Sequence, residues 1–286
     1  MDNKVMLFAD SSIDLTKELC ERYSIHTVPI HVILEEKTYE DGVDITTEEI
    51  FEHYYKTKEL PKTAAINVND IVTALKPYVD DGYEIVYISL GSALSSSYRN
   101  SCLAAEELDG KVYPVDSCSL STGAGLLAIE AAERIAKGMP AKRVAEEVTA
   151  LNQNNHASFV LDTLEFLRAG GRCSALAAFG ANLLGLKPSI KVFNDQQGAM
   201  GVGKKYRGKY DKVVMEYVDD TLAQFDNIKT DRAFVTYSSM SDGIEEKVLE
   251  YVKSKGIFKE VFLTRASGTI SSHCGPNTLG VLFMTE

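Results

Sequence analysis

Residues 84–101 read EIVYISLGSALSSSYRNS, and this stretch sets the fold prediction for the first half of the chain. Its short apolar run predicts a buried strand over Ile85–Ile88. Six of the thirteen residues from Ser89 to Ser101 are serine, and a helix is expected to begin in this turn and to run to about Leu108. A strand that passes directly into a helix is one unit of a parallel α/β sheet, and the serines would lie where such sheets bind ligands.

The same alternation continues on both sides of this unit. Strands are expected at Val5–Ala9, Thr27–Leu34 and Lys111–Val115. Helices are expected at about Leu15–Tyr23, Thr47–Tyr55, Asn69–Val79, Ser121–Lys137 and Ala141–Asn154. This order predicts an α/β fold with a parallel sheet.

The second half of the chain has a different rhythm. Strands are expected at Ser158–Leu161, at PSIKVF from Pro188, and at Ala233–Tyr237, Val261–Thr264 and Leu279–Met284. Amphipathic helices are expected at about Tyr210–Phe225 and Asp242–Lys255. Fewer strand–helix–strand units and a hairpin signal at Asp195–Gly198 predict an α+β domain with a mainly antiparallel sheet. We place the boundary near residue 155, so the predicted domains are 1–155 and 156–286.

Composition and charge argue against several function classes. The net charge of −11 makes nucleic acid or an anionic membrane surface an unexpected partner. Five scattered cysteines without a C-x-x-C pair argue against a disulfide framework or a structural zinc site, and favour the reduced thiols of a cytoplasmic protein. The N-terminus MDNKVMLFADSS is not typical of a signal peptide, and no apolar stretch approaches the roughly 18 residues of a membrane span.

Three expected strand ends carry hydroxyl groups. They are ADSS at 9–12, SLGS from Ser89, and VDSCSLS at 115–121. Hydroxyls and helix N-termini at one edge of a parallel sheet can hold an anionic oxygen. The alternative is that each serine only caps the helix that follows it. Three such turns at one edge favour a shared polar site.

Two further segments hold candidate site residues. In AGGR (169–172), Arg172 follows two glycines, which favour a left-handed backbone or a close approach, and an arginine fixed in this way suits a carboxylate. In HCGPN (273–277), His273 precedes a tight Gly-Pro turn. The alternatives are a helix C-cap with an exposed arginine and a structural histidine.

The segment GKKYRGK (203–209) concentrates basic residues in an acidic chain. It is either a solvated loop or a docking patch for an acidic partner or a phosphate. The usual signatures of nucleotide binding, serine hydrolysis and zinc proteolysis are missing from the sequence. The five histidines show no metal-ligand spacing, so neither a metal nor a cofactor is expected.

Six segments, in order along nearly the whole chain, resemble the DegV family of bacterial fatty-acid-binding proteins. They are FADSSIDL (8–15), YEDGVDITTEEIFEHY (39–54), SLGSALSSSYRNS (89–101), VDSCSLSTGAGLLAIEAA (115–132), VLDTLEFLRAGGRCS (160–174) with LLGLKPSI (183–190), and HCGPNTLGVLF (273–283). The resemblance implies two domains, an N-terminal parallel α/β domain and a C-terminal α+β domain, with a long-chain fatty acid in a tunnel between them. It further implies a carrier without catalysis of its own. Such a carrier presents the carboxylate to a separate ATP-dependent fatty acid kinase subunit, which makes an acyl phosphate for phospholipid synthesis.

The resemblance also implies roles for single residues. Thr63 in PKTAAIN matches the family's threonine, and Ser95 matches the serine of its Leu-Ser-Gly-Thr-Tyr segment; both are expected to bind the carboxylate, with Ser96 beside them. Arg172 and His273 are expected near the head group. The basic residues Lys204 and Arg207 are expected to face the kinase subunit.

This chain departs from the family pattern around the head group. Ala64, Ala65, Ile66 and Asn67 stand where relatives carry Ser-Gln-Pro-Ser; Ser96 and Ser97 replace Gly-Thr, and Asn277 replaces a glycine. The acyl tail is expected against apolar residues of SALAAFGANLLGL (174–186). Two alternatives stay open: a serine-dependent lipid hydrolase or acyltransferase using a serine near Ser95 with His273, and a binder of another small carboxylate or phosphate.

Overall fold

The computed structural model describes residues 4–174 and 185–286. Its strands are β1 (Val5–Asp10), β2 (Ile25–Val28), β3 (His31–Leu34), β4 (Lys37–Glu40), β5 (Lys62–Ala64), β6 (Glu84–Ser89), β7 (Val112–Asp116), β8 (Asn155–His156), β9 (Ser158–Leu161), β10 (Lys187–Phe193), β11 (Ala199–Tyr206), β12 (Ile228–Tyr237), β13 (Glu260–Arg265) and β14 (Thr278–Thr285). Its α-helices are α1 (Lys17–Tyr23), α2 (Thr47–Thr57), α3 (Val68–Asp80), α4 (Ser97–Glu107), α5 (Ser121–Ala136), α6 (Ala141–Ala150), α7 (Glu165–Gly170), α8 (Tyr210–Leu222), α9 (Ile244–Ser254) and α10 (Gly268–Cys274).

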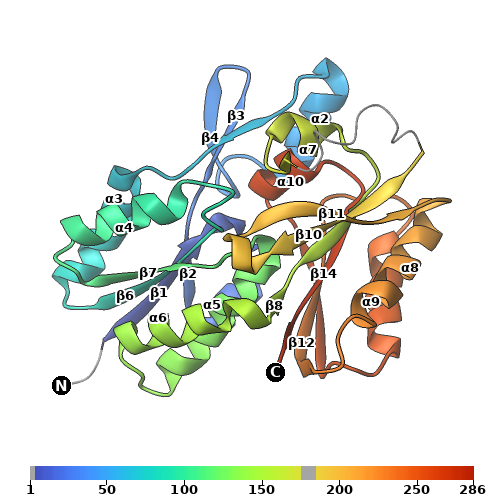
Figure 1. Ribbon diagram of the computed structural model, residues 1–286. Coiled ribbons are helices and arrows are strands. Elements are labelled where there is room, and N and C mark those ends of the chain that lie inside the picture. The colour runs from blue at the N-terminus through green and yellow to red at the C-terminus, as the bar shows by residue number, and fades with distance from the viewer. Residues whose placement is uncertain (1–3, 175–184) are drawn as a thin grey trace.

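The N-terminal sheet is parallel, as predicted. Its strand order is β2-β1-β6-β7. Helices α3 and α4 cover one face, and α5 and α6 cover the other (Figure 1). Because both faces are covered, the four residues from Ile85 to Ile88 are completely buried, which explains why this strand is a continuous apolar run.

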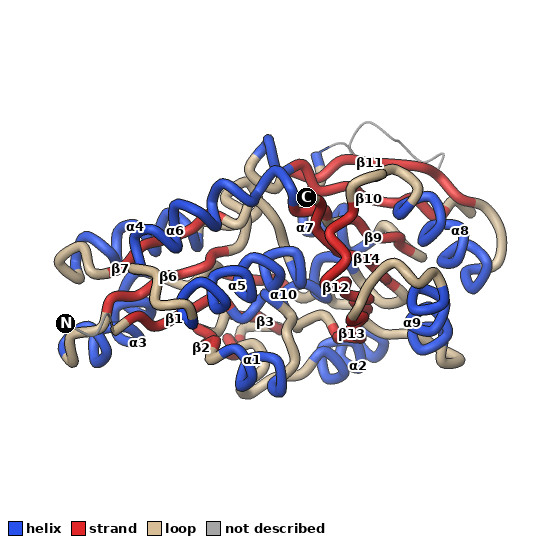
Figure 2. Tube along the Cα trace, turned by 90° about the horizontal axis from the view of Figure 1, so that it is seen from below, coloured by secondary structure: helices blue, strands red, loops and turns tan. Residues whose placement is uncertain are grey.

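The C-terminal sheet is mainly antiparallel, as predicted, with the order β11-β10-β9-β14-β12-β13 and with β8 beside β14. Its one parallel pair in the described residues is β12–β13, with α9 between these strands in the chain. Helices α8 and α9 pack on one side of this sheet (Figure 1). Helix α5 lies between the two large sheets (Figure 2), and every residue from Ser121 to Ala132 is buried. The domain division at residue 155 stays a prediction.

A third, small sheet has the order β4-β3-β5. The single strand expected over Thr27–Leu34 is wrong, because the chain forms β2 in the parallel sheet and β3 in the small one. Pro29, which has no N–H group, separates the two strands, and the N–H of Ile30 donates to the hydroxyl of Ser11 instead of a strand partner. This switch carries the chain out of the first sheet and lets β3 hold β5 at the cavity described below.

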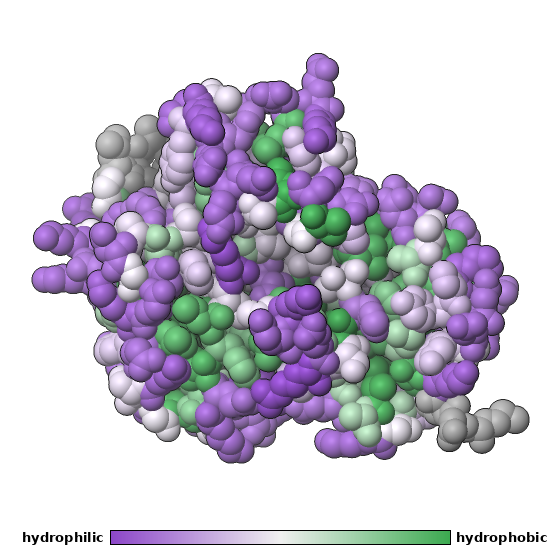
Figure 3. All heavy atoms as spheres, turned by 180° about the vertical axis from the view of Figure 1, so that it is seen from behind, coloured by the Kyte–Doolittle hydropathy of each residue, from purple (hydrophilic) through white to green (hydrophobic). Residues whose placement is uncertain are grey.

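On the face seen in Figure 3, hydrophilic side chains predominate, and apolar side chains form several clusters between them. Among the described residues, no helix combines the length and apolar character needed to cross a bilayer.

Candidate functional site

A cavity of about 220 Å³ opens between the two large sheets, far more than the roughly 10–15 Å³ that a single buried water needs. Its walls come from the carboxyl ends of β6 and β7, from β9, β12 and β14, and from α10. Apolar side chains supply much of the lining: Ile30, Leu90, Leu94, Leu120, Phe159, Leu167, Met200, Ile270 and Leu282. Such a wall suits an apolar ligand.

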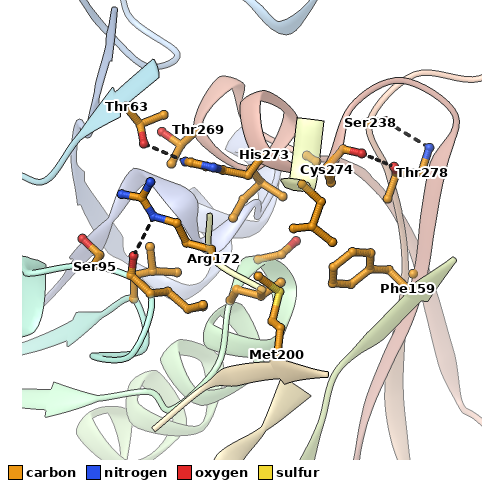
Figure 4. A pocket seen from close by; sticks show the side chains of 18 of the residues that line it. Thr63, Ser95, Phe159, Arg172, Met200, Ser238, Thr269, His273, Cys274 and Thr278 are labelled. Carbon is orange, nitrogen blue, oxygen red and sulfur yellow. Dashed lines mark hydrogen bonds between the residues drawn. The ribbon is translucent and has the colours of Figure 1, made fainter. Parts of the chain in front are cut away.

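One end of the cavity is polar. The side chains of Thr63, Ser95, Arg172 and His273 all reach it (Figure 4). The Thr63 hydroxyl lies 2.8 Å from Nε2 of His273, although these residues are 210 positions apart. Arg172 is exposed, and its guanidinium donates to the backbone carbonyls of Gly170 at 2.6 Å and of Leu94 at 3.5 Å. A cationic donor and hydroxyls therefore meet at the surface end of a cavity that apolar side chains line for the most part.

The backbone of α7 explains where Arg172 and His273 lie. A Cβ atom at Gly170 would lie 2.3 Å from Nδ1 of His273, so only glycine lets the histidine ring pack there. Gly171 has φ +68°, the left-handed conformation that ends the helix and turns Arg172 toward the cavity.

Helix α10 carries His273 in its last turn. This short helix is held at its other end by Asp41, whose carboxylate accepts the N–H groups of Gly268 and Thr269 at 2.8 and 2.7 Å. A carboxylate at a helix N-terminus pairs with free N–H groups and with the helix dipole. Asp41 thus positions His273 from a distance.

His273 is a neutral side chain at ordinary pH. Burial, with a smaller contribution from the charge of Arg172, lowers its pKa to about 4. Its Nδ1 is buried and has no hydrogen-bond partner within the described part of the chain. A buried N–H without an acceptor is rare, so we assign the proton to Nε2, which then donates to Oγ1 of Thr63. The Thr63 hydroxyl hydrogen is left to donate to a ligand.

The serine turn, residues 90–96 between β6 and α4, lies at the same polar end, across from Thr63 and His273. Ser95 lines the cavity, and its hydroxyl accepts the N–H of Ser97 at 3.2 Å. Ser96 also lines the cavity and precedes α4, whose first N–H groups point back toward the turn. Below the turn, Asp10 accepts from the N–H of Leu90 and the hydroxyl of Tyr87, both at 2.8 Å. Complete burial raises the pKa of Asp10 to about 6 despite these bonds.

The three hydroxyl-rich strand ends do converge, but they contribute unequally. The turns after β6 and β7 supply cavity-lining serines, namely Ser95, Ser96 and Ser121. The turn after β1 does not: Asp10 supports the serine turn, and Ser11 accepts the N–H of Ile30. The expectation of a shared polar edge is therefore met by two turns of the three.

A second buried carboxylate lies behind Ser121. Asp14 accepts the Ser121 hydroxyl at 2.5 Å and the N–H of Ser267 at 2.9 Å. Its burial, which outweighs these hydrogen bonds, raises its pKa to about 7. Asp14 was not among the predicted site residues, because nothing in the sequence shows that it is buried.

Asp14→Asn should remove a pH dependence of stability. The pKa of Asp14 is raised from 3.8, its value in the unfolded chain, to about 7 in the folded chain. The folded chain therefore binds the proton more tightly. The stabilisation is complete below about pH 4 and is lost as the pH rises through about 7. The full change corresponds to about 4 kcal/mol, of which about 2.6 kcal/mol falls between pH 5 and pH 8. Urea unfolding at pH 5 and pH 8 should therefore show a smaller fall in the free energy of unfolding for the variant than for the parent chain.

Asp109→Asn is the matched control. Asp109 has a similar left-handed backbone, with φ 54°, but it is exposed. Its replacement should leave the pH dependence unchanged. An unchanged pH dependence in Asp14→Asn would show that Asp14 is ionised in the folded chain at pH 5.

The family model described as "Uncharacterised protein, DegV family" matches residues 4–286. The chain belongs to the DegV family. Among DegV relatives, a DegV domain-containing protein of Clostridium perfringens is 27% identical over 287 residues, and the alignment covers 99% of each chain. The family predicted from the six sequence segments is therefore confirmed.

Solved DegV structures share this fold. A DegV family protein from Thermus thermophilus, reported for its fatty acid binding, is 27% identical and superposes with a TM-score of 0.90 over 99% of this chain and 100% of that one. DegV from Bacillus subtilis, described as a fatty acid binding protein, is 25% identical and superposes with a TM-score of 0.83 over 99% of both chains. The α/β fold with a parallel and a mainly antiparallel sheet is that of these proteins.

The remaining predicted residues of this DegV protein lie apart from the cavity wall. Lys204 lies near the end of β11 and forms ion pairs with Glu216 and Asp220 of α8, at 2.9 and 2.7 Å. Arg207 is exposed in the following turn. Met200, at the start of β11, lines the cavity, but Lys204 is four residues further along, or about 13 Å. A role of Lys204 and Arg207 toward a partner stays a prediction, and residues 175–184 of the expected tail-binding segment lie outside the described residues.

Several residues of the polar lining were missed from the sequence. Thr236, Ser238 and Thr278 come from β12, the turn after it and β14, and Thr269 comes from α10. Their hydroxyls mostly bond within the protein; for example, Ser238 donates to the carbonyl of Gly275 at 2.6 Å. In the sequence, a threonine or serine in a strand has the same pattern whether it faces a cavity or not. No local signal therefore identified these residues.

Proposed function

We propose that this protein binds one long-chain fatty acid, with the acyl tail in the cavity and the carboxylate at Thr63, Ser95 and Arg172. The observation that carries the proposal is one cavity whose lining is mostly apolar and whose surface end brings together Thr63, Ser95 and Arg172. The fatty acid binding reported for the relatives from Thermus thermophilus and Bacillus subtilis supports it. Ser96 and His273 complete the proposed head-group site, His273 by orienting the Thr63 hydroxyl.

The energetics suit such a ligand. Burying about 15 methylene groups at about 0.8 kcal/mol each gives a gross gain of about 12 kcal/mol, which chain ordering and association reduce considerably. A carboxylate without partners would cost several kcal/mol to bury. Hydrogen bonds from Thr63 and Ser95, together with the positive charge of Arg172, offset this cost. The neutral state of His273 leaves Arg172 as the cation among the cavity-lining residues that the structure describes.

We further propose that the protein is a carrier, which presents this carboxylate to a separate ATP-dependent fatty acid kinase subunit. The exposure of Arg172 and Ser96 supports this, since both lie where the head group would meet solvent. An ionised carboxylate is also the better nucleophile toward the γ-phosphate. In this proposal ATP and metal belong to the partner.

The hydrolase alternative needs a serine paired with a histidine. In the described residues, the Ser95 hydroxyl pairs with Ser97 at 3.0 Å, and Nε2 of His273 pairs with Thr63. No observation favours this alternative, and the turnover measurement below distinguishes it.

Protein purified without added lipid should contain about one long-chain fatty acid per chain. The measurement is denaturation, extraction into organic solvent and mass spectrometry, followed by incubation of the stripped protein with fatty acids of different lengths. The protein alone should neither hydrolyse acyl esters nor consume ATP. A chain that is empty after purification and takes up no added fatty acid would overturn the proposal, and ester turnover would favour the hydrolase.

A further inference from the structure

Two carboxylates and an imidazole converge beside the small sheet, outside the cavity. They belong to Glu35, which follows β3, to His53 on α2, and to Glu59, which follows α2. One nitrogen or oxygen atom from each residue lies within 4.8 Å of the others. Strand β3 and helix α2 both lie at the top of Figure 1. The sequence spacings of 18 and 6 residues match no metal motif, so this cluster is a product of the fold.

Local backbone geometry places the three residues together. Glu35 has φ +53° in the tight turn that joins β3 to β4, where Leu34 pairs with Lys37. Lys58 ends α2 with φ +63°, and its N–H donates to the carbonyl of Tyr54 at 2.8 Å. This left-handed turn reverses the chain and brings Glu59 back beside His53, so that Oε2 and Nε2 lie 3.9 Å apart.

The imidazole is left without a suitable partner. Nε2 of His53 is buried and makes no hydrogen bond to any residue within 4–174 and 185–286, and 3.9 Å to Glu59 is too long for one. Over the same ranges, neither Glu35 nor Glu59 forms an ion pair with a lysine or an arginine. Two carboxylates this close repel each other unless a cation lies between them. A metal ion would accept the imidazole lone pair and neutralise both charges.

We propose that Glu35, His53 and Glu59 bind one divalent transition-metal ion, for which zinc is the best match. Zinc takes histidine nitrogen at about 2.0–2.1 Å and carboxylate oxygen at about 2.0–2.2 Å, with water as a fourth ligand. Magnesium and calcium prefer sets made only of oxygen. Bonds of this length put tetrahedral ligand atoms about 3.4 Å apart, and the exposed Glu35 and Glu59 side chains can close that distance by rotation. The ion would fasten the β3–β4 turn to the end of α2.

The test uses the full chain after treatment with a chelator. Zinc binding is measured by calorimetry, and cobalt is added separately because a four-coordinate cobalt site absorbs visible light. Glu35→Gln/Glu59→Gln is the variant, and Glu36→Gln/Glu52→Gln is the control, because it removes two exposed carboxylates from the same turn and helix without touching the cluster. His53→Gln removes the nitrogen ligand alone.

The parent chain and the control should bind one zinc ion per chain, with a higher Tm in zinc, and should give the cobalt spectrum. The Glu35→Gln/Glu59→Gln variant should lose at least about 100-fold in zinc affinity, and its Tm should no longer respond to zinc. Equal zinc binding by the variant would overturn the proposal and assign the ion to other groups, such as the half-buried cysteines. The proposal would also be overturned if the parent chain bound no zinc at micromolar concentrations. Fatty acid content should stay the same in all variants, which separates this result from the proposed function.

Discussion

Replacing Thr63 and Ser95 together by alanine should lower the affinity for a long-chain fatty acid by at least about 100-fold. Each hydroxyl is proposed to donate a hydrogen bond to the carboxylate, and hydrogen bonds to charged groups contribute about 1.5–3 kcal/mol each. Two of them therefore account for about 3 kcal/mol or more, and every 1.4 kcal/mol is a factor of ten in affinity. Titration of the delipidated protein with a fluorescent fatty acid, together with mass spectrometry of the purified variant, measures the loss.

Ser92→Ala is the control for this experiment. Ser92 lies in the same serine turn, three residues from Ser95, but does not line the cavity. It should bind fatty acid like the parent chain. Thr63 also bonds to His273. The Thr63→Ser variant keeps this hydroxyl, so it should retain most of the fatty acid affinity that Thr63→Ala loses. Undiminished binding by the double alanine variant would place the carboxylate elsewhere.

Ala266→Phe should abolish fatty acid binding and leave the fold intact. Ala266 is 4% exposed and lines the cavity between β13 and α10, so a phenyl ring there would occupy space that the acyl tail needs. Filling a cavity commonly stabilises a protein by about 0.5–2 kcal/mol. The variant should thus contain no extractable fatty acid, while its Tm without lipid should equal or exceed that of the stripped parent chain.

A phenyl ring outside the cavity provides the comparison. Ala93→Phe adds the same ring at an exposed position of the serine turn and should keep its lipid. Ala64→Phe is a second blocking variant, in case the ring at Ala266 disturbs packing. Ala64 is half-buried and also lines the cavity. Normal lipid content in both blocking variants would mean that the tail lies outside this cavity.

Much of the fold follows from local patterns in the sequence. The apolar run at Ile85–Ile88 and the long helix from Ser121 are found where they were expected. Helix α10 was missed because it is only seven residues long and because the N–H group of its first residue, Gly268, is bound by Asp41, 227 residues away in the chain. The break at Pro29 was missed for a similar reason, since the residues on both sides of it have strand character and only the tertiary fold separates them into two sheets.

The candidate site was predictable in part. Thr63, Ser95, Arg172 and His273 meet at one end of a cavity, although they come from four separate segments, and only the family resemblance connected them in advance. The buried acids Asp14 and Asp41 could not be found in this way. Their burial and their partners, Ser121, Ser267 and Gly268, exist only after the two halves of the chain have packed together.

The cavity wall is discontinuous in the chain, with contributions from Ile30 at one extreme and Leu282 at the other. Because only the tertiary fold brings these residues together, a fatty acid in the proposed site would be taken up after the chain has folded. A bound lipid would therefore report that the whole chain has reached its native state. Loss of lipid would, in turn, make the polypeptide more susceptible to proteases wherever they act on its transiently opened forms.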